Sequence, residues 1–331
     1  MRSDQQPIPQ HLYHDLLIIN GDAFQISHSG SVCLDLEDDT RVFFRDISDL
    51  EFTIDQGDIS VRETIEGRDL ADYALVQIAS YPRPTATLLN SITAYLEHRN
   101  RPLVNAAPIS APTKLFQLLK FSQNGLAVPA TRYMSRKLIG TSFGRLADDL
   151  GLPFVMKAMN ASGGRLNFLI ESEVDFLHYI HDPLYSGVAF LVQQFVPNNG
   201  TFRLLILNGQ AAIIMHRCST TGSHLTNTEQ GGHATLFDVD TFDRDALRMA
   251  TRAADILGCD VAGVNIVQDR HNGQWYLLEA NPNPAIGTGA FADEKRRAYS
   301  AYLRAKLAAG HPRSTPGRHH RAVSSDQTDH A

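Results

Sequence analysis

The sequence predicts an α+β protein that begins with a small α/β domain. An apolar run (73–78) is followed by apolar residues at helical spacing (85–100) and by a second short apolar run (102–105). This strand–helix–strand order is typical of an α/β unit. Further along, residues 201–217 contain two apolar runs separated by Asn208-Gly209, the clearest hairpin signal in the chain, because Asn and Gly tolerate positive φ. Helices and antiparallel hairpins are therefore expected beyond the α/β unit.

The composition is that of an ordinary globular protein. The chain has 331 residues, 43% hydrophobic and 20% charged, which is enough for one large domain or two to three small ones. Its net charge of -6 with mixed signs gives no reason to expect nucleic acid or a membrane as partner. No apolar run is long enough to span a bilayer, and the N-terminus lacks a signal-peptide pattern. Three widely spaced cysteines, Cys33, Cys218 and Cys259, predict reduced thiols in a cytoplasmic protein.

The N-terminal domain is expected to span residues 1–110. Residues 1–14 are polar and predict a loose arm, and 16–19 form a short apolar strand. Turn residues then separate further short strands, which we expect to form one small sheet. These strands are predicted at 31–36, 41–44, 52–54 and 59–64.

A second unit is expected over residues 111–196. It opens with a helix that starts at Pro112-Thr113-Lys114 and ends at Asn124-Gly125, a helix stop signal. The remaining elements are a strand after 126–131, a short helix at 141–150, strands at 153–157 and 166–170, a helix at 173–181 and a strand at 189–196.

The third unit is expected over residues 197–309. After the 201–217 hairpin comes a polar loop, 218–235, which is long enough to be functional. A helix then runs from its cap Asp243 to Leu257. A hairpin at 261–280 and a short helix at 299–309 follow, and the polar tail 310–331 is predicted to be disordered.

The 261–280 hairpin carries the first candidate site. If its loop is the three residues 271–273 with Gly273 left-handed, Asn265 lies opposite Glu279 with Cβ atoms roughly 5 Å apart. Asn281 keeps the same face. Three oxygen-bearing side chains on one face suit a hard cation such as Mg²⁺. A two-residue turn would put Asn265 and Glu279 on opposite faces and leave an ordinary capped hairpin, so both interpretations are open.

Two further segments suit a nucleotide. Lys157 ends a strand before the loop 160–165, where an ammonium and free backbone amides can hold phosphates. The segment 193–196 ends an apolar strand before a bend and can present backbone groups to a purine. Taken singly, each is more commonly a plain structural feature: a hairpin with a surface lysine, and the end of a core strand.

Positive charge on the 201–217 hairpin is a third candidate. Arg203, His216 and Arg217 lie on its two strands, and arginines clamp phosphate or carboxylate groups through bidentate hydrogen bonds. Arginines more commonly lie on the protein surface without a specific ligand. Lys114 lies at a helix start, where the helix dipole disfavours a cation, which weakly indicates a partner.

The order of these features resembles the ATP-grasp superfamily, over about Lys114 to Gly287. Within it the chain looks most like the group of glutathione synthetases and ribosomal-protein glutamate ligases, including peptide ligases of the graspetide type. The resemblance is carried by the segments 155–157, 162–164, 193–196, 262–265 and 278–282. It implies an ATP-grasp fold, in which the lobes 111–196 and 197–309 clamp a nucleotide.

The resemblance also implies residue roles. Lys114 and Lys157 would contact phosphates, and Ser162, Gly163 and Gly164 would lie in the loop that closes over them. Gln194, Phe195 and Val196 would hold adenine. Arg217, with Arg203, would act on the acyl phosphate and the transferred phosphoryl group. Glu279, Asn281 and Asn265 would bind Mg²⁺ (or Mn²⁺), with Asn227 nearby.

The implied function is an ATP-dependent carboxylate–amine ligase that acts through an acyl phosphate. The acceptor would be a peptide, a protein or an amino acid, and related ligases are often oligomeric, so a homo-oligomer is expected. Three positions depart from the family pattern: Asn265 and Thr201 replace Asp, and Gln194 replaces Glu. Loss of a carboxylate weakens Mg²⁺ binding. The alternatives are therefore a nucleotide-binding regulatory protein with an impaired metal site, and a scaffold that binds no ATP.

Overall fold

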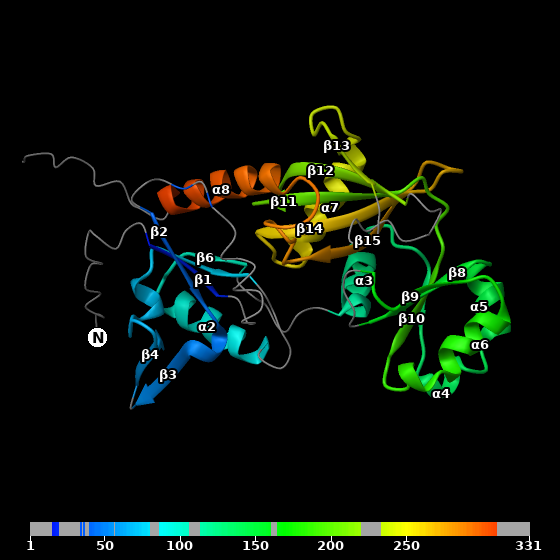
Figure 1. The fold of residues 1–331 in the computed structure, drawn as a ribbon, viewed down its shortest axis with the longest axis horizontal. Coiled ribbons are helices and arrows are strands. Elements are labelled where there is room, and N and C mark those ends of the chain that lie inside the picture. The colour runs from blue at the N-terminus through cyan, green and yellow to red at the C-terminus, as the bar shows by residue number, and fades with distance from the viewer. Residues whose placement is uncertain are drawn as a thin grey trace, which may run out of the picture.

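The computed structural model describes residues 15–19, 34, 36, 40–55, 57–79, 86–105, 113–159, 164–219 and 233–309. The predictions for the arm 1–14, the tail 310–331, Cys33, Ser162, Gly163 and Asn227 lie outside the described residues, as does most of the predicted strand 31–36. These described residues form four sheets, and Figure 1 shows the first (blue) and the central one (green) at opposite ends, with the C-terminal sheet between them.

The N-terminal sheet is parallel, with strand order β2-β1-β5-β6. Its strands are β1 (Asp15–Ile19), β2 (Arg41–Arg45), β5 (Leu75–Ile78) and β6 (Leu103–Val104). The helix α2 (Ala86–His98) connects β5 to β6, which confirms the predicted strand–helix–strand unit.

The expectation of one small sheet before residue 66 was wrong. β2 pairs in parallel with β1, while β3 (Leu50–Asp55) and β4 (Asp58–Glu63) form a separate antiparallel hairpin. Strand pairing across a parallel sheet depends on crossover connections, which local turn signals do not reveal.

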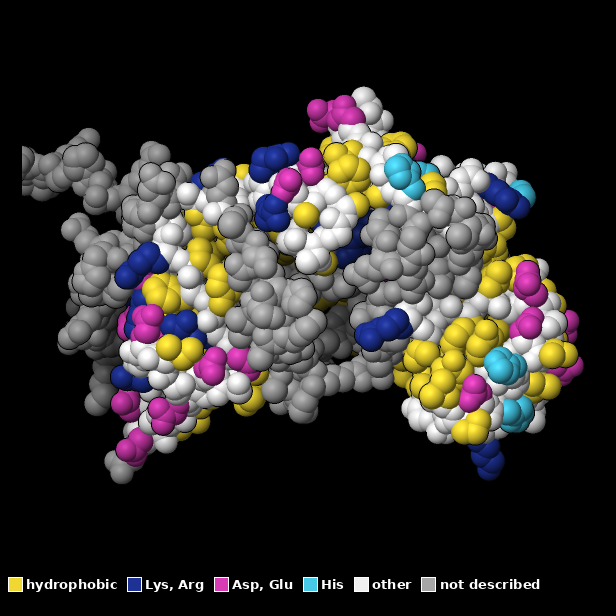
Figure 2. Space-filling view, in the orientation of Figure 1, with side chains coloured by type: hydrophobic (Ala, Val, Ile, Leu, Met, Phe, Trp, Pro, Cys, Tyr) yellow, Lys and Arg dark blue, Asp and Glu magenta, His cyan; other side chains and the backbone are white. Residues whose placement is uncertain are grey.

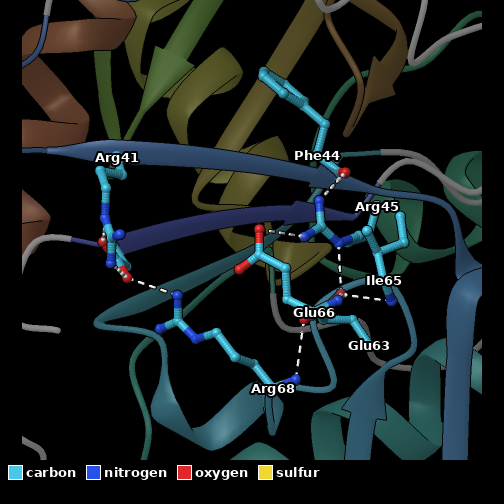
Figure 3. A network of polar contacts seen from close by, with 8 residues as sticks. Arg41, Phe44, Arg45, Glu63, Ile65, Glu66 and Arg68 are labelled. Carbon is cyan, nitrogen blue, oxygen red and sulfur yellow. Dashed lines mark hydrogen bonds and ion pairs between the residues drawn. The ribbon is translucent and has the colours of Figure 1, made fainter.

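A buried ion network ties this domain together (Figure 3). The Glu63 carboxylate is fully buried and accepts hydrogen bonds from the Arg45 side chain and from the backbone N–H groups of Ile65, Glu66 and Arg68. Asp15, also buried, pairs with both Arg41 and Arg68. Each buried carboxylate thus has a cationic partner, which offsets the cost of its desolvation.

The central sheet is antiparallel, with strand order β7-β10-β8-β9. Its elements are β7 (Thr131–Tyr133), α4 (Arg136–Ile139), α5 (Phe143–Leu150), β8 (Phe154–Ala158), β9 (Asn167–Ile170), α6 (Glu173–His181) and β10 (Phe190–Gln194). α6 has the predicted bounds, and its cap Ser172 accepts from the Asp175 N–H. α4 is a single turn that the sequence analysis did not predict.

Only one face of the central sheet is covered by its own helices. Phe154, Met156 and Ala158 of β8 pack with residues of α5 and α6 in one core cluster. Since neighbouring residues of a strand point to opposite faces, Val155 and Lys157 point away from this core.

The C-terminal sheet is antiparallel, with strand order β13-β12-β11-β14-β15. Its strands are β11 (Thr201–Leu207), β12 (Gln210–Cys218), β13 (His233–Phe237), β14 (Val261–Gln268) and β15 (Trp275–Asn281). The predicted hairpin at Asn208-Gly209 is confirmed. The predicted loop 218–235 wrongly included the first three residues of β13, a short and mostly exposed edge strand.

Two helices cover the faces of this sheet. α7 (Arg244–Ile256), capped by Asp243 as predicted, packs through a run of alanines on one face. α8 (Ala292–Ala309) packs on the other face and also against the N-terminal sheet. Leu16 and Leu75 thereby share a core with Leu205 and Leu303, and Figure 1 shows α8 lying along both sheets.

α8 begins at Ala292, not near Tyr299 as predicted. Residues 292–298 are mostly polar, so they carry no apolar helical period. Among the described residues, no helix is both long and apolar enough to cross a membrane. On the described part of the face in Figure 2, acidic and basic side chains are interspersed.

The N-terminal and C-terminal sheets are also joined by hydrogen bonds at Asn105. Its side chain accepts from the Val261 N–H and donates to the carbonyls of Val261 and Pro282. Lys306 of α8 pairs with Asp260 beside it. These contacts place the start of β14 and the end of β15 against the N-terminal domain.

Candidate active site

One face of the C-terminal sheet changes from apolar to polar along its strands. Leu205, Ile213 and Met215 lie on this face and pack under α8. Arg203 lies on β11 two residues before Leu205. It is the cross-strand partner of Asn265, and Asn265 is in turn the cross-strand partner of Glu279. α8 therefore covers the apolar part, and the polar part gathers the candidate residues.

A β-bulge turns Glu279 toward this polar face. Gln268 pairs with Trp275, so an even number of residues (269–274) joins the strands, and the register then shifts between Asn265 and Ile266. As a result Leu277 and Ala280 both lie in the α7 core, while Glu279 points to the other side. Bulges often re-aim a side chain next to a functional site.

The predicted pairing of Asn265 with Glu279 is confirmed, but the predicted turn was wrong. Gly273 is left-handed, with φ of 74°, as expected. The loop, however, is longer than three residues and even in length. The bulge adds one residue to β15, and this extra residue brings Glu279 opposite Asn265, as the three-residue turn was expected to do. The sequence of the turn alone does not reveal the bulge.

Asn265 is the centre of a hydrogen-bonded cluster. Its Nδ2 donates to Glu279 Oε1 at 2.7 Å. Its Oδ1 accepts from Arg203 Nη1 and from Arg217 Nη2, each at 3.1 Å. The two predicted catalytic arginines and two of the predicted metal ligands are thus in direct contact.

Gly263 gives the Arg203 guanidinium its place. A Cβ at residue 263 would lie 2.7 Å from Arg203 Cζ, nearer still to Nη2, and 2.9 Å from Pro284 Cβ. Real Cβ atoms essentially never approach other atoms so closely. The guanidinium therefore lies against β14 at Gly263, close to both Asn265 and Pro284.

A third cation, Lys295, lies beside the arginines. It is 4% exposed, and its Nζ donates to the carbonyls of Ala285 at 2.9 Å and Thr288 at 2.6 Å. Burial, with repulsion from Arg203 and Arg217, lowers the pKa of Lys295 to about 8. The sequence analysis missed this residue, because it lies in a polar run that resembles an exposed helix surface.

The pKa of Arg217 is lowered by its surroundings. Burial is the main cause that lowers its pKa to about 10; repulsion from Arg203 adds to it, and attraction by Glu279 opposes it. Arg217 Nη2 also contacts Thr201 Oγ1 at 3.4 Å. A crowded group of cations, of which Lys295 is buried and the two arginines are half-buried, is a favourable place for an anionic ligand.

Lys157 and Lys114 reach the same electrostatic field from two other elements. Burial lowers the pKa of Lys157 to about 8; attraction by Glu279 opposes this shift, and repulsion from Lys114 adds to it. Burial also lowers the pKa of Lys114, the first residue of α3 (Lys114–Gln123), against the attraction of Glu279. Both predicted phosphate-binding lysines thus lie close enough to the Glu279 carboxylate for its charge to affect their pKa values.

Gln193 belongs to the candidate segment 193–196, but no role was predicted for its side chain. It is buried on β10, accepts from Lys157 Nζ at 2.7 Å and donates to Thr131 Oγ1 at 2.9 Å. The predicted adenine-contacting residues follow it: Gln194 is exposed at the end of β10, Phe195 is half-buried and Val196 is buried. The backbone N–H of Gln194 donates to the Ala130 carbonyl.

Two further predicted residues have clear places. Gly164, with φ of 73°, lies in the turn that leads into β9. Asn281 is the last residue of β15, and its Oδ1 accepts from the Asn283 N–H at 2.9 Å. Gln117 of α3, not predicted, accepts from the Ala280 N–H at 3.0 Å and so ties the helix that carries Lys114 to β15.

The oxygens of Glu279 and Asn281 fit a single hard cation. They lie two residues apart on one face, and Mg²⁺ is usually held by one or two carboxylates together with substrate phosphates. Within the described residues, no group of three or more His, Cys, Asp or Glu side chains is placed to form a metal cage. Asn265 fits less well, because its oxygen already accepts from two guanidinium cations.

A comparison with protein-family models identifies the domain that carries these residues. The model described as RimK-like ATP-grasp domain matches residues 113–292, more than half of the chain. The chain belongs to the RimK-like ATP-grasp family. The matched range begins one residue before Lys114 and ends beyond Asn281, so it includes every predicted site residue.

Curated relatives of this RimK-like protein are named as a ligase and a synthase. It is 29% identical over 209 residues to a probable alpha-L-glutamate ligase of Parasynechococcus marenigrum, covering 62% of this chain and 43% of the relative. It is 26% identical over 272 residues to the human beta-citrylglutamate synthase B, covering 78% of this chain and 66% of the relative. The chain thus spans less than two thirds of the length of these relatives.

Solved structures confirm the ATP-grasp fold. The ligase PsnB complexed with minimal precursor, Mg and ADP superposes with a TM-score of 0.62 at 14% identity, over 89% of this chain and 97% of that chain. The D-alanine–D-alanine ligase of Bacillus anthracis complexed with ATP gives 0.64 at 12% identity, over 90% and 98%. The predicted α+β class and ATP-grasp fold are both borne out.

Proposed function

We propose that this RimK-like protein is an ATP-dependent ligase that joins a carboxylate to an amine through an acyl phosphate. The observation that carries the proposal is the cluster in which Arg203 and Arg217 donate to Asn265 while Asn265 donates to Glu279. Lys114 and Lys157, from two other elements, lie close enough for the charge of Glu279 to oppose the lowering of their pKa values. Partly buried cations around one carboxylate suit the phosphates of a nucleotide held with a divalent cation.

The residue roles in this proposal are those that the resemblance implies. Lys114 and Lys157 would bind the nucleotide phosphates, and the backbone at Gln194, Phe195 and Val196 would receive the adenine. The roles predicted for Ser162, Gly163 and Asn227, which lie outside the described residues, stay predictions, as does that of Gly164. Glu279 and Asn281 hold Mg²⁺, or Mn²⁺ in its place. Arg203 and Arg217 bind the acyl phosphate.

The reaction has two steps. A carboxylate oxygen of the acyl substrate attacks the γ-phosphorus of ATP, and ADP leaves with the electrons of the broken P–O bond. The amine then attacks the acyl carbon, inorganic phosphate leaves, and the nitrogen loses a proton. The bound Mg²⁺ would neutralise charge on the phosphate oxygens. The arginines supply fixed donors where negative charge develops, and such preorganised donors are a large part of catalysis.

The acceptor is proposed to be an amino acid or a peptide, including a peptide segment of a protein. Support comes from the relatives named glutamate ligase and citrylglutamate synthase, and from neighbours bound to a precursor peptide. We propose an N-terminal domain of residues 1–110, a central lobe of 111–196 and a C-terminal lobe of 197–309, because each range contributes its own sheet. A cytoplasmic location and a homo-oligomeric state stay predictions from the sequence.

Nucleotide binding and turnover test the proposal. Mg-ATP at millimolar concentration should raise the melting temperature, because a ligand that binds only the folded state stabilises it. With a suitable acceptor the protein should release ADP, and Glu279→Ala should abolish this. Glu51→Ala, which removes an exposed carboxylate from a strand of the N-terminal domain, is the matched control.

Two results would contradict the assignment. If Mg-ATP leaves the melting temperature unchanged, the protein is a scaffold that binds no nucleotide. If ADP release persists in Glu279→Ala, the metal assignment is wrong. The alternative of a regulatory protein with an impaired metal site rests on Asn265, and the ligase names of the relatives do not favour it.

A further inference from the structure

We propose that Asn265 is a positioning residue, an amide bridge that holds Arg203 and Arg217 beside Glu279, and that it is not a ligand of the divalent cation. This inference rests on the proposed ligase function of the same site. Asn265, which replaces the aspartate of the family pattern, would then organise the site and not merely weaken its metal binding.

The chemistry of an amide explains why Asn suits this position. The carboxamide oxygen accepts two hydrogen bonds and the nitrogen donates two. Here the oxygen accepts from two guanidinium groups, and the nitrogen donates to a carboxylate. An aspartate can accept from the arginines but cannot donate to Glu279. It would place two carboxylates directly opposite each other, which is destabilising.

The sheet fixes the geometry of the bridge. Arg203 and Glu279 are the direct cross-strand partners of Asn265 on either side, so the three side chains emerge in one row. Arg217 lies on β12, which is separated from β14 by β11. It pairs with Thr201 across the strands and reaches Asn265 from there. Gly263 leaves room for the Arg203 guanidinium, and Asn265 is only 8% exposed. The bridge is therefore built into the backbone register.

The same contacts disfavour a metal at Asn265. A divalent cation bound to Oδ1 would stand beside two guanidinium groups that already occupy that oxygen, and like charges at such distances repel strongly in a buried site. Glu279 Oε1 instead accepts from the Asn265 amide nitrogen, and Asn281 Oδ1 accepts from the Asn283 backbone N–H. Cation binding is therefore assigned to Glu279 and Asn281.

Two readouts separate a bridge from a ligand. The first is Mn²⁺ affinity in the presence of ADP, measured by electron paramagnetic resonance without turnover. Asn281→Ala should weaken Mn²⁺ binding about tenfold, because it removes an oxygen ligand, whereas Asn265→Ala should change it by about twofold or less. The second is the affinity for inorganic phosphate in EDTA, followed by the shift in melting temperature.

The phosphate readout should give the opposite pattern. Asn265→Ala should weaken phosphate binding about tenfold, because the two guanidinium groups are no longer held together as charge-assisted donors. Asn281→Ala should leave it unchanged. Asn265→Leu, which keeps the volume of the buried side chain, should behave as Asn265→Ala does and guards against a folding defect in the smaller variant.

The proposal is overturned if Asn265→Ala and Asn265→Leu weaken Mn²⁺ binding as much as Asn281→Ala, or if they leave phosphate binding unchanged. If the unaltered protein binds no Mn²⁺ with ADP, the proposed ligase function fails instead. The phosphate titration in EDTA then still decides whether Asn265 organises the two arginines.

Discussion

Substitution of Gly263 by alanine should disable the site through a single added methyl group. The new Cβ would lie 2.7 Å from Arg203 Cζ, where ordinary contact begins at 3.4 Å. The guanidinium must therefore move by roughly 1 Å, unless β14 itself shifts. A displacement of that size in a catalytic group can lower the rate about 100-fold. A guanidinium is the far end of a flexible side chain, but Arg203 is held by Asn265 and Pro284 Cβ cannot swing away. We therefore expect Gly263→Ala to cost about 1–3 kcal/mol of unfolding free energy.

The measurements are ADP release with an acceptor and urea denaturation. Gly144→Ala is the matched control, because a Cβ at that position of α5 meets nothing within 4 Å and alanine favours a helix. Its turnover should be unchanged and its unfolding free energy equal or higher. Gly263→Ala should lower both quantities.

A double variant isolates the cause. In an Arg203→Ala background most of the clash disappears, and only the 2.9 Å approach to Pro284 Cβ is left. The stability cost of Gly263→Ala should then be smaller than in the unaltered protein, as expected for residues in contact. Equal costs in both backgrounds, or a Gly263→Ala variant with normal turnover and stability, would refute the placement of Arg203 over β14.

Two further predictions concern stability. Burial lowers the pKa of Lys157 to about 8 from its ordinary 10.5, so between these values the unfolded chain binds more protons at this site. Urea denaturation from pH 7 to 10 should show an unfolding free energy that rises with pH. The rise should be smaller in Lys157→Met and unchanged in Lys120→Met, the control at an exposed residue. Equal slopes in all three proteins would contradict the lowered pKa of Lys157. Asn105→Ala should lower the unfolding free energy by about 3 kcal/mol, because it leaves the Val261 N–H and two carbonyls without their partner. Asn100→Ala, at an exposed residue with a similar positive φ, should cost much less, and equal losses would show that backbone strain alone is responsible.

Local rules predicted those elements whose signals lie within a few residues. The helix α6 has its predicted bounds, Asp243 caps α7, and Asn208-Gly209 turns the β11–β12 hairpin. Caps and tight turns depend on φ preferences and on hydrogen bonds between near neighbours. The sequence alone also placed most of the residues that the structure brings together around Glu279.

The orientation of that site was decided by tertiary structure. The bulge near Glu279, the burial of Lys295 and the contact of Gln193 with Lys157 all depend on segments that are distant in the chain. The same holds for the start of α8, where Lys295 donates to the carbonyls of Ala285 and Thr288 in the preceding segment.

For Asn265 the sequence determined the residue type and its strand, and so suggested a weakened metal ligand. Only the register of four strands puts two guanidinium groups on its oxygen and a carboxylate at its nitrogen. The physical reason is that an amide can donate and accept at once, and which of these it does depends on neighbours that only the folded sheet supplies.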